Sequence, residues 1–264
     1  MSMLPKPKGL GPTYGAQFGD HSVADAYPTR PPYPPELFTI LLGLIHDQSH
    51  GILDLGCGTG DIARSFAPHV TQVDAVDPSG PMIACGQALP GGQHPNIQWI
   101  VSTAEDFAYL STYALVVTAE SLHWMDWSTI LPHIRHSLTP QGRLAIVLGR
   151  GFQNEPWAEE VSHLIAQYST NREYESYNLL AELAKRDLFT PEQSLQTTPI
   201  PFTQSVDAYV ESFHSRNGLS RERMGSSAAA FDQQLKAIIA RYQPNPALTF
   251  ELVADVAWGV PSAG

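Results

Sequence analysis

Three glycines follow an acidic residue within one short stretch. Gly56, Gly58 and Gly60 come directly after the strand-like run that contains Asp54. Glycine has no Cβ, so it adopts positive φ and lets a ligand approach the main chain closely. A helical pattern resumes at Ile62, and the first N–H groups of a helix are unpaired. The spacing indicates a strand, a glycine turn and a helix start that bind a polar ligand. Taken alone, it also fits a dinucleotide.

A second acidic residue lies at the end of the next predicted strand. Residues 72–77 (QVDAVD) have strand character, and Asp77 is the last of them. It follows the glycine turn by about twenty residues, where a carboxylate accepts both hydroxyl hydrogens of a ribose. Taken alone, Asp77 also fits an ordinary turn cap, because Pro78 and Ser79 follow it.

The fourth predicted strand is also followed by reactive side chains. Residues 114–118 (ALVVT) form an apolar run of the kind that is buried on both faces of a parallel sheet, and His123 and Trp124 follow. Open α/β sheets bind ligands beyond the carboxyl ends of their strands. His123 is therefore a candidate base or orienting group for a hydroxyl or carboxylic acid. The equal alternative is that His123 packs structurally beneath Trp124.

Aromatic residues and an arginine stand on a proline-rich stretch before the first long helix. Residues 18–35 carry Tyr27, Arg30 and Tyr33 among five prolines. Because proline blocks a regular helix, we expect a stiff, irregular segment. It either presents its side chains to a ligand or serves as a linker.

Strand and helix patterns alternate through the first part of the chain. This alternation predicts an α/β fold with a doubly wound, mostly parallel sheet. The predicted strands are 51–55, 72–77, 96–101, 114–118 and 144–148, and the predicted helices are 36–48, 62–67, 81–89 and 128–138.

The pattern changes after Gly149. Residues 152 to about 188 look helical, and further elements are expected at 194–202 (a sixth strand), 206–213 and 228–242 (helices) and 248–258 (a closing seventh strand). His214 and Arg216 follow one of these helices, and we expect a solvated helix end there rather than a site for an acidic substrate group.

Four segments are predicted within one compact domain. They are a flexible N-terminal tail at 1–17, a cofactor-binding core at 18–150, a helical cap or substrate region at 151–245, and a closing strand with a C-terminal tail at 246–264.

The composition argues against several classes of protein. The 264 residues carry a net charge of −11 with only 15 Lys+Arg, so nucleic acid is not an expected partner. Cys57 and Cys85 form neither a disulfide framework nor a zinc pattern, and we expect no bound metal. No apolar run is long enough to span a membrane, and no signal peptide is recognisable. We expect a cytoplasmic monomer or homodimer that acts on a small molecule.

The order of these motifs resembles class I S-adenosylmethionine-dependent methyltransferases. LDLGCGTG is followed by VDAVDPSGPM, STAEDF, LVVTAESLHWMDW and LTPQGRLAIV. The sequence is most similar to the small-molecule branch with trans-aconitate methyltransferase-like proteins and methyltransferase type 11 domains. The opening pattern of that branch is matched by Ala24, Tyr27, Arg30, Pro31, Tyr33 and Pro34. The resemblance implies a Rossmann-like seven-stranded sheet and S-adenosylmethionine as the cofactor.

The resemblance also implies roles for individual residues. The nucleoside end of the cofactor would contact Asp77 at the ribose, Pro78 and Met82 beside it, and Ala104 and Glu105 at the adenine edge. The methionine end would contact the glycine turn and its neighbours, with Arg30 neutralising the carboxylate. Its residues would be Asp54, Gly56, Gly58, Gly60, Arg30 and Glu120.

The leading functional hypothesis is methyl transfer from S-adenosylmethionine to a small molecule, on the oxygen of a carboxylate or hydroxyl. Tyr27 and Tyr33 would close over the methyl group, since aromatic faces suit a cationic sulfonium, and His123 completes the catalytic candidates. No nucleophile of the protein is needed, because the reaction requires mainly in-line positioning. Two alternatives are open. One is a chain that binds the cofactor but catalyses a non-methylating reaction such as a cyclisation. The other is a dinucleotide-dependent dehydrogenase, which the GxGxG spacing disfavours.

Overall fold

A mixed sheet with the strand order β3-β2-β1-β4-β5-β8-β6 forms the centre of the protein. The computed structural model describes residues 6–10, 15–47, 49–175 and 177–263. The first five strands are parallel, and β8 runs antiparallel to β5, β6 and β7. This confirms the predicted doubly wound, mostly parallel α/β sheet. The strands are β1 (Gly51–Leu55), β2 (Val73–Asp77), β3 (Ile97–Val101), β4 (Tyr113–Ala119), β5 (Leu138–Gln153), β6 (Gln193–Gln196), β7 (Ile200–Ser205) and β8 (Ala247–Gly259).

The described part of the chain has eight strands in this sheet rather than the predicted seven. The expected sixth strand at 194–202 is divided into β6 and β7, which pair with successive parts of β8. Between them, Thr197 N–H donates to the carbonyl oxygen of Ala254 at 2.9 Å, and Pro199 follows. Proline has no N–H to continue a ladder, so the strand breaks at this point.

Helices cover both faces of the sheet. Because side chains alternate along a strand, Ile52 packs on one face and Leu53 on the other. The Ile52 face is covered by α3 (Pro35–Gly43), α4 (Asp61–Phe66) and α5 (Gly80–Ala88), and the Leu53 face by α6 (Trp127–Ser137) and α8 (Leu179–Lys185). The first of these helices ends at Gly43, earlier than the predicted boundary at 48.

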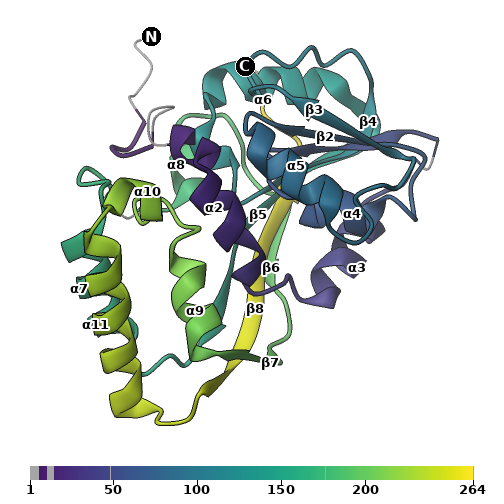
Figure 1. Cartoon of the computed structure of the whole chain (residues 1–264). Coiled ribbons are helices and arrows are strands. Elements are labelled where there is room, and N and C mark those ends of the chain that lie inside the picture. The colour runs from purple at the N-terminus through teal and green to yellow at the C-terminus, as the bar shows by residue number, and fades with distance from the viewer. Residues whose placement is uncertain (1–5, 11–14, 48, 176, 264) are drawn as a thin grey trace.

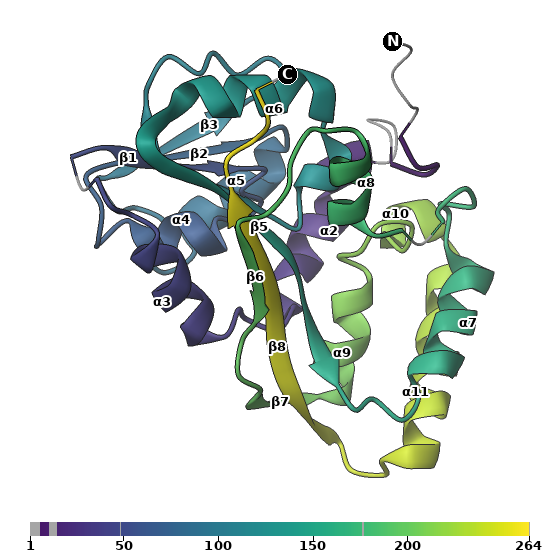
Figure 2. The ribbon, with the colours of Figure 1, turned by 180° about the vertical axis from the view of Figure 1, so that it is seen from behind.

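The region predicted as a cap is connected to the sheet through two long strands, β5 and β8. β5 continues to Gln153, where the sequence predicted a strand end at 148 and a helix from 152, and it pairs with β8 over this extension. The single helix predicted at 152–188 is two helices, α7 (Ala158–Tyr168) and α8. Phe152 and Phe250 stack with ring centroids 3.9 Å apart at the base of the cap core, which α7, α9 (Val206–Phe213) and α11 (Ser227–Tyr242) complete. Figures 1 and 2 show β5 and β8 running from the sheet toward these helices.

The segment before the first long helix is more regular than predicted. It contains η1 (Ala16–Gly19), α2 (His21–Ala26) and η2 (Tyr27–Thr29), because its prolines begin only at Pro28. α2 contacts α5 of the core as well as α9 and α10 (Arg221–Met224) of the cap, and so links the two parts (Figure 1).

Part of the expected flexible tail at 1–17 can be placed. Residues 1–5 and 11–14 lie outside the described residues. Lys6 Nζ donates to the carbonyl oxygens of His123 and Met125, both at 2.8 Å. The division of the chain into tail, core, cap and closing strand stays a prediction. None of the helices in the described ranges has the length and apolar character needed to cross a bilayer.

Candidate active site

The glycine turn after β1 has the left-handed backbone that its sequence predicts. Gly58 has φ +56° and Gly60 has φ +74°. A Cβ on Gly60 would lie 2.3 Å from Cη2 of Trp99, so no larger residue fits there. A Cβ on Gly58 would lie 3.2 Å from Cε of Met82, on the wall of a cavity. The turn therefore brings bare main chain to the cavity surface.

Asp54 lies behind this turn. Its Oδ2 accepts a hydrogen bond from the N–H of Ala63 at 3.0 Å, which stabilises the start of α4. Its Oδ1 has no partner, and the side chain does not line the cavity. Burial raises the pKa of Asp54 to about 8. A direct contact between Asp54 and the cofactor stays a prediction.

Asp77 connects the end of β2 to the glycine turn. Its two oxygens accept the N–H groups of Gly58 and Ser79, each at 2.8 Å. Burial raises its pKa, and the two main-chain donors oppose that shift. Each carboxylate oxygen keeps a second lone pair, and Asp77 borders the cavity. It is therefore oriented to accept hydroxyl groups of a ligand.

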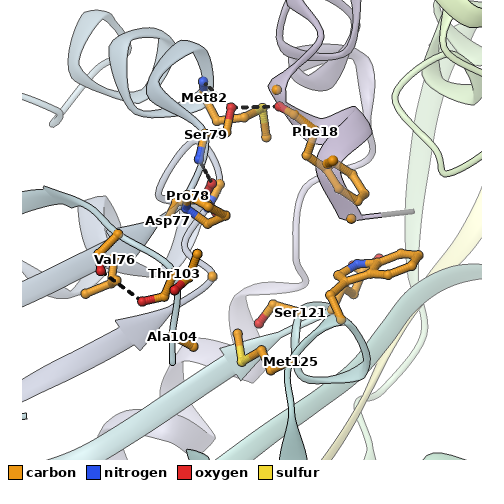
Figure 3. Close-up of a pocket in the computed structure, with 18 of the residues that line it drawn as sticks. Phe18, Val76, Asp77, Pro78, Ser79, Met82, Thr103, Ala104, Ser121 and Met125 are labelled. Atoms are coloured by element: carbon orange, nitrogen blue, oxygen red, sulfur yellow. Dashed lines mark hydrogen bonds between the residues drawn. The ribbon is translucent and has the colours of Figure 1, made fainter. Parts of the chain in front are cut away.

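The cavity has a volume of about 440 Å³ and lies at the carboxyl ends of β1, β2 and β4. Figure 3 shows Asp77, Pro78 and Ser79 on one wall, with Ser121 and Met125 facing them. Nine of the residues predicted to bind the cofactor line it: Tyr27, Gly56, Gly58, Asp77, Pro78, Met82, Ala104, Glu105 and Glu120. Arg30, Asp54 and Gly60 do not, and the roles of all twelve stay predictions.

Several lining residues were not predicted. Phe18 and Trp124 approach each other with ring centroids 5.7 Å apart, and Ser121 Oγ donates to the carbonyl of Leu55 at 2.7 Å. Phe18 belongs to the aromatic, proline-rich stretch at residues 18–35. Its aromatic side chain was the only sequence signal that could have predicted a place in the cavity wall. For Ser121 and Met125, the sequence offered no signal except that both residues follow the fourth strand.

Glu120 lies at the centre of an ion-pair network. Its backbone has φ +54°. Tyr33 Oη donates to Oε1 at 3.0 Å, and Arg150 Nε lies 3.3 Å from the same oxygen. Arg30 Nη1 lies 3.5 Å from Oε2. Burial acts to raise the pKa of Glu120, but the charges of Arg150 and Arg30 more than offset it and hold the pKa below its usual value.

Arg30 and Tyr33 are thus engaged within the protein. Arg30 also donates from Nε to Oγ of Ser215 at 2.8 Å and stacks over the ring of Tyr27 at 4.6 Å. Tyr33 lines neither this cavity nor the one described next, and it contacts Glu120 instead. The predicted contact of Arg30 with the cofactor carboxylate and the closure of Tyr33 over the methyl group stay predictions.

A second cavity of about 970 Å³ adjoins the first. The two share Phe18, Tyr27, Glu120 and Trp124. His123 lines the second cavity, and its ring centroid lies 4.4 Å from that of Trp124. Burial lowers the pKa of His123 to about 4, so its imidazole is neutral near pH 7. The far wall comes from α7, the segment after it and the turn after α9.

The turn after α9 is not a solvated helix end, so that prediction is wrong. His214 is fully buried. Its Nδ1 lies 2.7 Å from the carbonyl oxygen of Leu219, and its Nε2 lies 2.6 Å from Oδ1 of Asp232. Because two partners hold its ring, His214 has a structural role. Arg216, by contrast, lines the second cavity.

Comparison with known proteins shows a similarity to methyltransferases over part of the chain. Residues 52–142 match the methyltransferase domain family. An uncharacterized methyltransferase of Mycobacterium tuberculosis is 30% identical over 52% of this chain and 54% of its own length. The chain thus spans about half the length of the curated relatives it matches. A trans-aconitate 2-methyltransferase of Azoarcus is 28% identical over 53% of this chain and 59% of that protein.

The fold agrees with this class. An S-adenosylmethionine-dependent methyltransferase from Geobacter sulfurreducens, solved in complex with S-adenosyl-L-homocysteine, has a similar fold with a TM-score of 0.50. It is 15% identical, and the alignment covers 99% of this chain and 100% of that one. Residues 52–142 are therefore similar to methyltransferase domains, and the chain shares its fold with an S-adenosylmethionine-dependent methyltransferase.

Proposed function

We propose that this chain transfers the methyl group of S-adenosylmethionine to an oxygen atom of a small molecule. The observation that carries the proposal is the meeting of two cavities at Tyr27, Glu120 and Trp124. One is lined by the glycine turn and Asp77, which suit a nucleoside with hydroxyl groups. The other is large enough for a metabolite and opens from the same place.

The residues of the first cavity fit the cofactor chemically. Asp77 would bind the ribose hydroxyls, and Glu105 would hold the base edge, where its Oε1 already accepts the N–H of Asp126 at 2.7 Å. When bound, S-adenosylmethionine supplies a methyl group whose bond to sulfur breaks while the acceptor oxygen bonds to carbon, and the electron pair stays on sulfur. Phe18 and Trp124 would keep water from the shared opening.

The protonation state of His123 bears on the accepting atom. A hydroxyl acceptor must lose a proton, whereas a carboxylate loses none. Since the pKa of His123 is about 4, its imidazole is a weak base for removing a hydroxyl proton. This favours a carboxylate acceptor, with His123 as an orienting group. The trans-aconitate 2-methyltransferase relative supports a small-molecule substrate for this chain as well.

Calorimetric titration with S-adenosylhomocysteine tests the cofactor half of the proposal. We expect wild type to bind, and Asp77→Asn to bind about tenfold to a hundredfold more weakly because charge-assisted hydrogen bonds are lost. Asp207→Asn alters an exposed carboxylate on α9 and should match wild type. No binding by wild type, or equal binding by Asp77→Asn, would contradict the proposal, as would thermal stabilisation by NAD alone.

Product analysis tests the reaction half. Small carboxylic acids and alcohols would be incubated with the chain and S-adenosylmethionine, and products examined by mass spectrometry for the gain of one methylene unit. A methyl ester releases methanol in mild alkali, whereas a methyl ether does not, so the same samples identify the accepting oxygen. Cofactor turnover that yields rearranged products without that gain would support the non-methylating alternative.

A further inference from the structure

Arg216 differs from the other arginines of the chain. Among the residues that the structure describes, every other arginine forms a hydrogen bond or ion pair through its guanidinium. For Arg216 there is one contact, stacking over the ring of Phe213 at 4.0 Å. Its half-buried guanidinium therefore forms no hydrogen bond or ion pair with a carboxylate of the described residues, although Glu155 and Glu120 act on it electrostatically.

The backbone that carries Arg216 is held firmly. Arg216 N–H donates to the carbonyl oxygen of Phe213 at 2.9 Å, and its own carbonyl accepts from Leu219 N–H at 3.2 Å. On one side, Ser215 Oγ donates to the carbonyl of Ser212 at 2.6 Å, and His214 precedes it in its buried position. The main chain on this side is fixed, and stacking on Phe213 helps to hold the guanidinium at its position.

The second cavity has an excess of positive charge. Its charged lining residues are Arg30, Arg172, Arg216 and one carboxylate, Glu120. Glu120 is already paired with Arg30 and Arg150, so it does not neutralise Arg216. The chain as a whole carries −11, so this cavity is positive within an acidic protein. Such a cavity concentrates anions.

Burial of the guanidinium lowers the pKa of Arg216, and the charge of Arg30 acts in the same direction, while Tyr209, Glu155 and Glu120 oppose the shift without cancelling it. Both effects reflect a cation that lies in a partly desolvated place beside another cation. An anion seated between them would relieve both.

The chemistry of the lining indicates which anion fits. A guanidinium stacked on an aromatic ring keeps its N–H edge free, and that edge matches the two oxygens of a carboxylate. Apolar and aromatic side chains complete the wall, among them Leu148, Ile165, Tyr174 and Leu179. The lining therefore fits an organic acid with an apolar body.

Arg216 borders the second cavity and not the first. A carboxylate held there would lie on the wall formed by the turn after α9. Two hydrogen bonds would also engage its lone pairs, so it would be a poor methyl acceptor. The anchored group and the accepting oxygen are therefore different groups of one molecule.

We propose that Arg216 binds a carboxylate of the methyl acceptor that is not the reacting group, so that the substrates are small organic acids. This inference rests on the proposed function. Arg216 is a specificity-determining residue, because it recognises a group that does not react.

Calorimetry with a matched pair of probes tests this inference. The probes are 3-phenylpropanoate and its amide, titrated into the full chain with and without S-adenosylhomocysteine. We expect the acid to bind and the amide to bind at least about tenfold more weakly. Arg216→Met should weaken binding of the acid by about tenfold or more, while Arg216→Lys should give an intermediate value because the planar fork is lost.

Arg143→Met is the control. Arg143 lies on β5 and lines neither cavity, and its Nε donates to Oε2 of Glu192 at 2.8 Å. This variant should bind the acid within about twofold of wild type. Unchanged melting temperatures for both Met variants show that each is folded.

Several results would overturn the inference. They are equal binding of the acid by wild type and Arg216→Met, no binding of the acid by wild type, and tighter binding of inorganic phosphate than of the acid. Failure of the proposed function is distinguishable. If S-adenosylhomocysteine does not bind but the acid still binds in an Arg216-dependent manner, the anion site stands and the methyl-transfer proposal falls.

Discussion

The first cavity lies among the strand-end loops of the parallel sheet, whereas the second lies between those loops and the cap. In the first, the carboxylate of Asp77 accepts hydrogen bonds from the main-chain N–H groups of Gly58 and Ser79. In the second, Arg216 has no such partner. The difference indicates that one cavity is complete in itself and suits one fixed ligand. The other keeps an unpaired charge that a substrate can use.

Two arginines give the largest expected contrast. Arg150 Nη1 lies 3.0 Å from Asp61 Oδ2 while Nε approaches Glu120, and its side chain is 3% exposed. Arg150→Met would leave Glu120 buried with less compensation, and we expect a loss of about 3–5 kcal/mol in the free energy of unfolding. Arg216→Met removes a cation without an anionic partner, so we expect a change within about 0.5 kcal/mol. Urea unfolding measures both. Similar losses in the free energy of unfolding for Arg150→Met and Arg216→Met would contradict the difference that we infer between the two arginines.

The glycine turn gives the next contrast. Gly60→Ala combines φ +74° with a Cβ 2.3 Å from Trp99, and we expect it to cost about 3 kcal/mol. Gly91→Ala also has positive φ, at +82°, but its Cβ would meet Arg64 Cβ at an ordinary 3.6 Å. We expect that variant to cost about 1 kcal/mol in the same urea experiment, from backbone strain alone. Equal losses would show that the close packing of the turn on Trp99 contributes nothing.

The same contrast explains what the sequence could predict. The first cavity is built from consecutive strand ends, so the glycine turn and Asp77 could be recognised from local spacing, whereas Glu105 was implied only by the resemblance to methyltransferases. The doubly wound sheet followed for the same reason, because each strand and helix carries its own apolar pattern. Nine of the twelve proposed cofactor residues line the cavity, although their contacts with a ligand stay predictions.

The second cavity could not be predicted from local sequence spacing. Its walls come from residues near 18–30, 120–124, 162–179 and 216–217, which only the tertiary fold brings together. Arg216 follows α9 like any exposed helix end, and nothing local shows that His214 beside it is fully buried. The split of β6 from β7 and the extension of β5 depend on pairing with β8, which is likewise a distant segment.

Asp54, which lies behind the glycine turn, gives a pH dependence of stability. Its pKa in the folded protein is about 8, above its usual value, so the folded state binds the proton more tightly. The stability that Asp54 contributes is therefore greatest at low pH. It falls as pH rises through the folded pKa, by up to about 1.4 kcal/mol per pH unit. Between pH 6.5 and 8, Asp54→Asn should flatten this fall in urea unfolding, whereas exposed Asp25→Asn should retain it. An unchanged slope in Asp54→Asn would contradict the account.

His123 gives the smallest expected effect, where the two cavities adjoin. Its pKa of about 4 means that the ring is already neutral at pH 6, so it has no ionisation to contribute between pH 6 and 8. For a carboxylate acceptor we expect kcat/KM to show no inflection near pH 6.5, and His123→Gln to lower it by less than about tenfold with the profile unchanged. Exposed His136→Gln on α6 is the control. An inflection near pH 6.5 that disappears only in His123→Gln would show that His123 removes a proton during turnover. In that case the accepting oxygen would be a hydroxyl, and the unreactive carboxylate at Arg216 would be the only acid group the site requires.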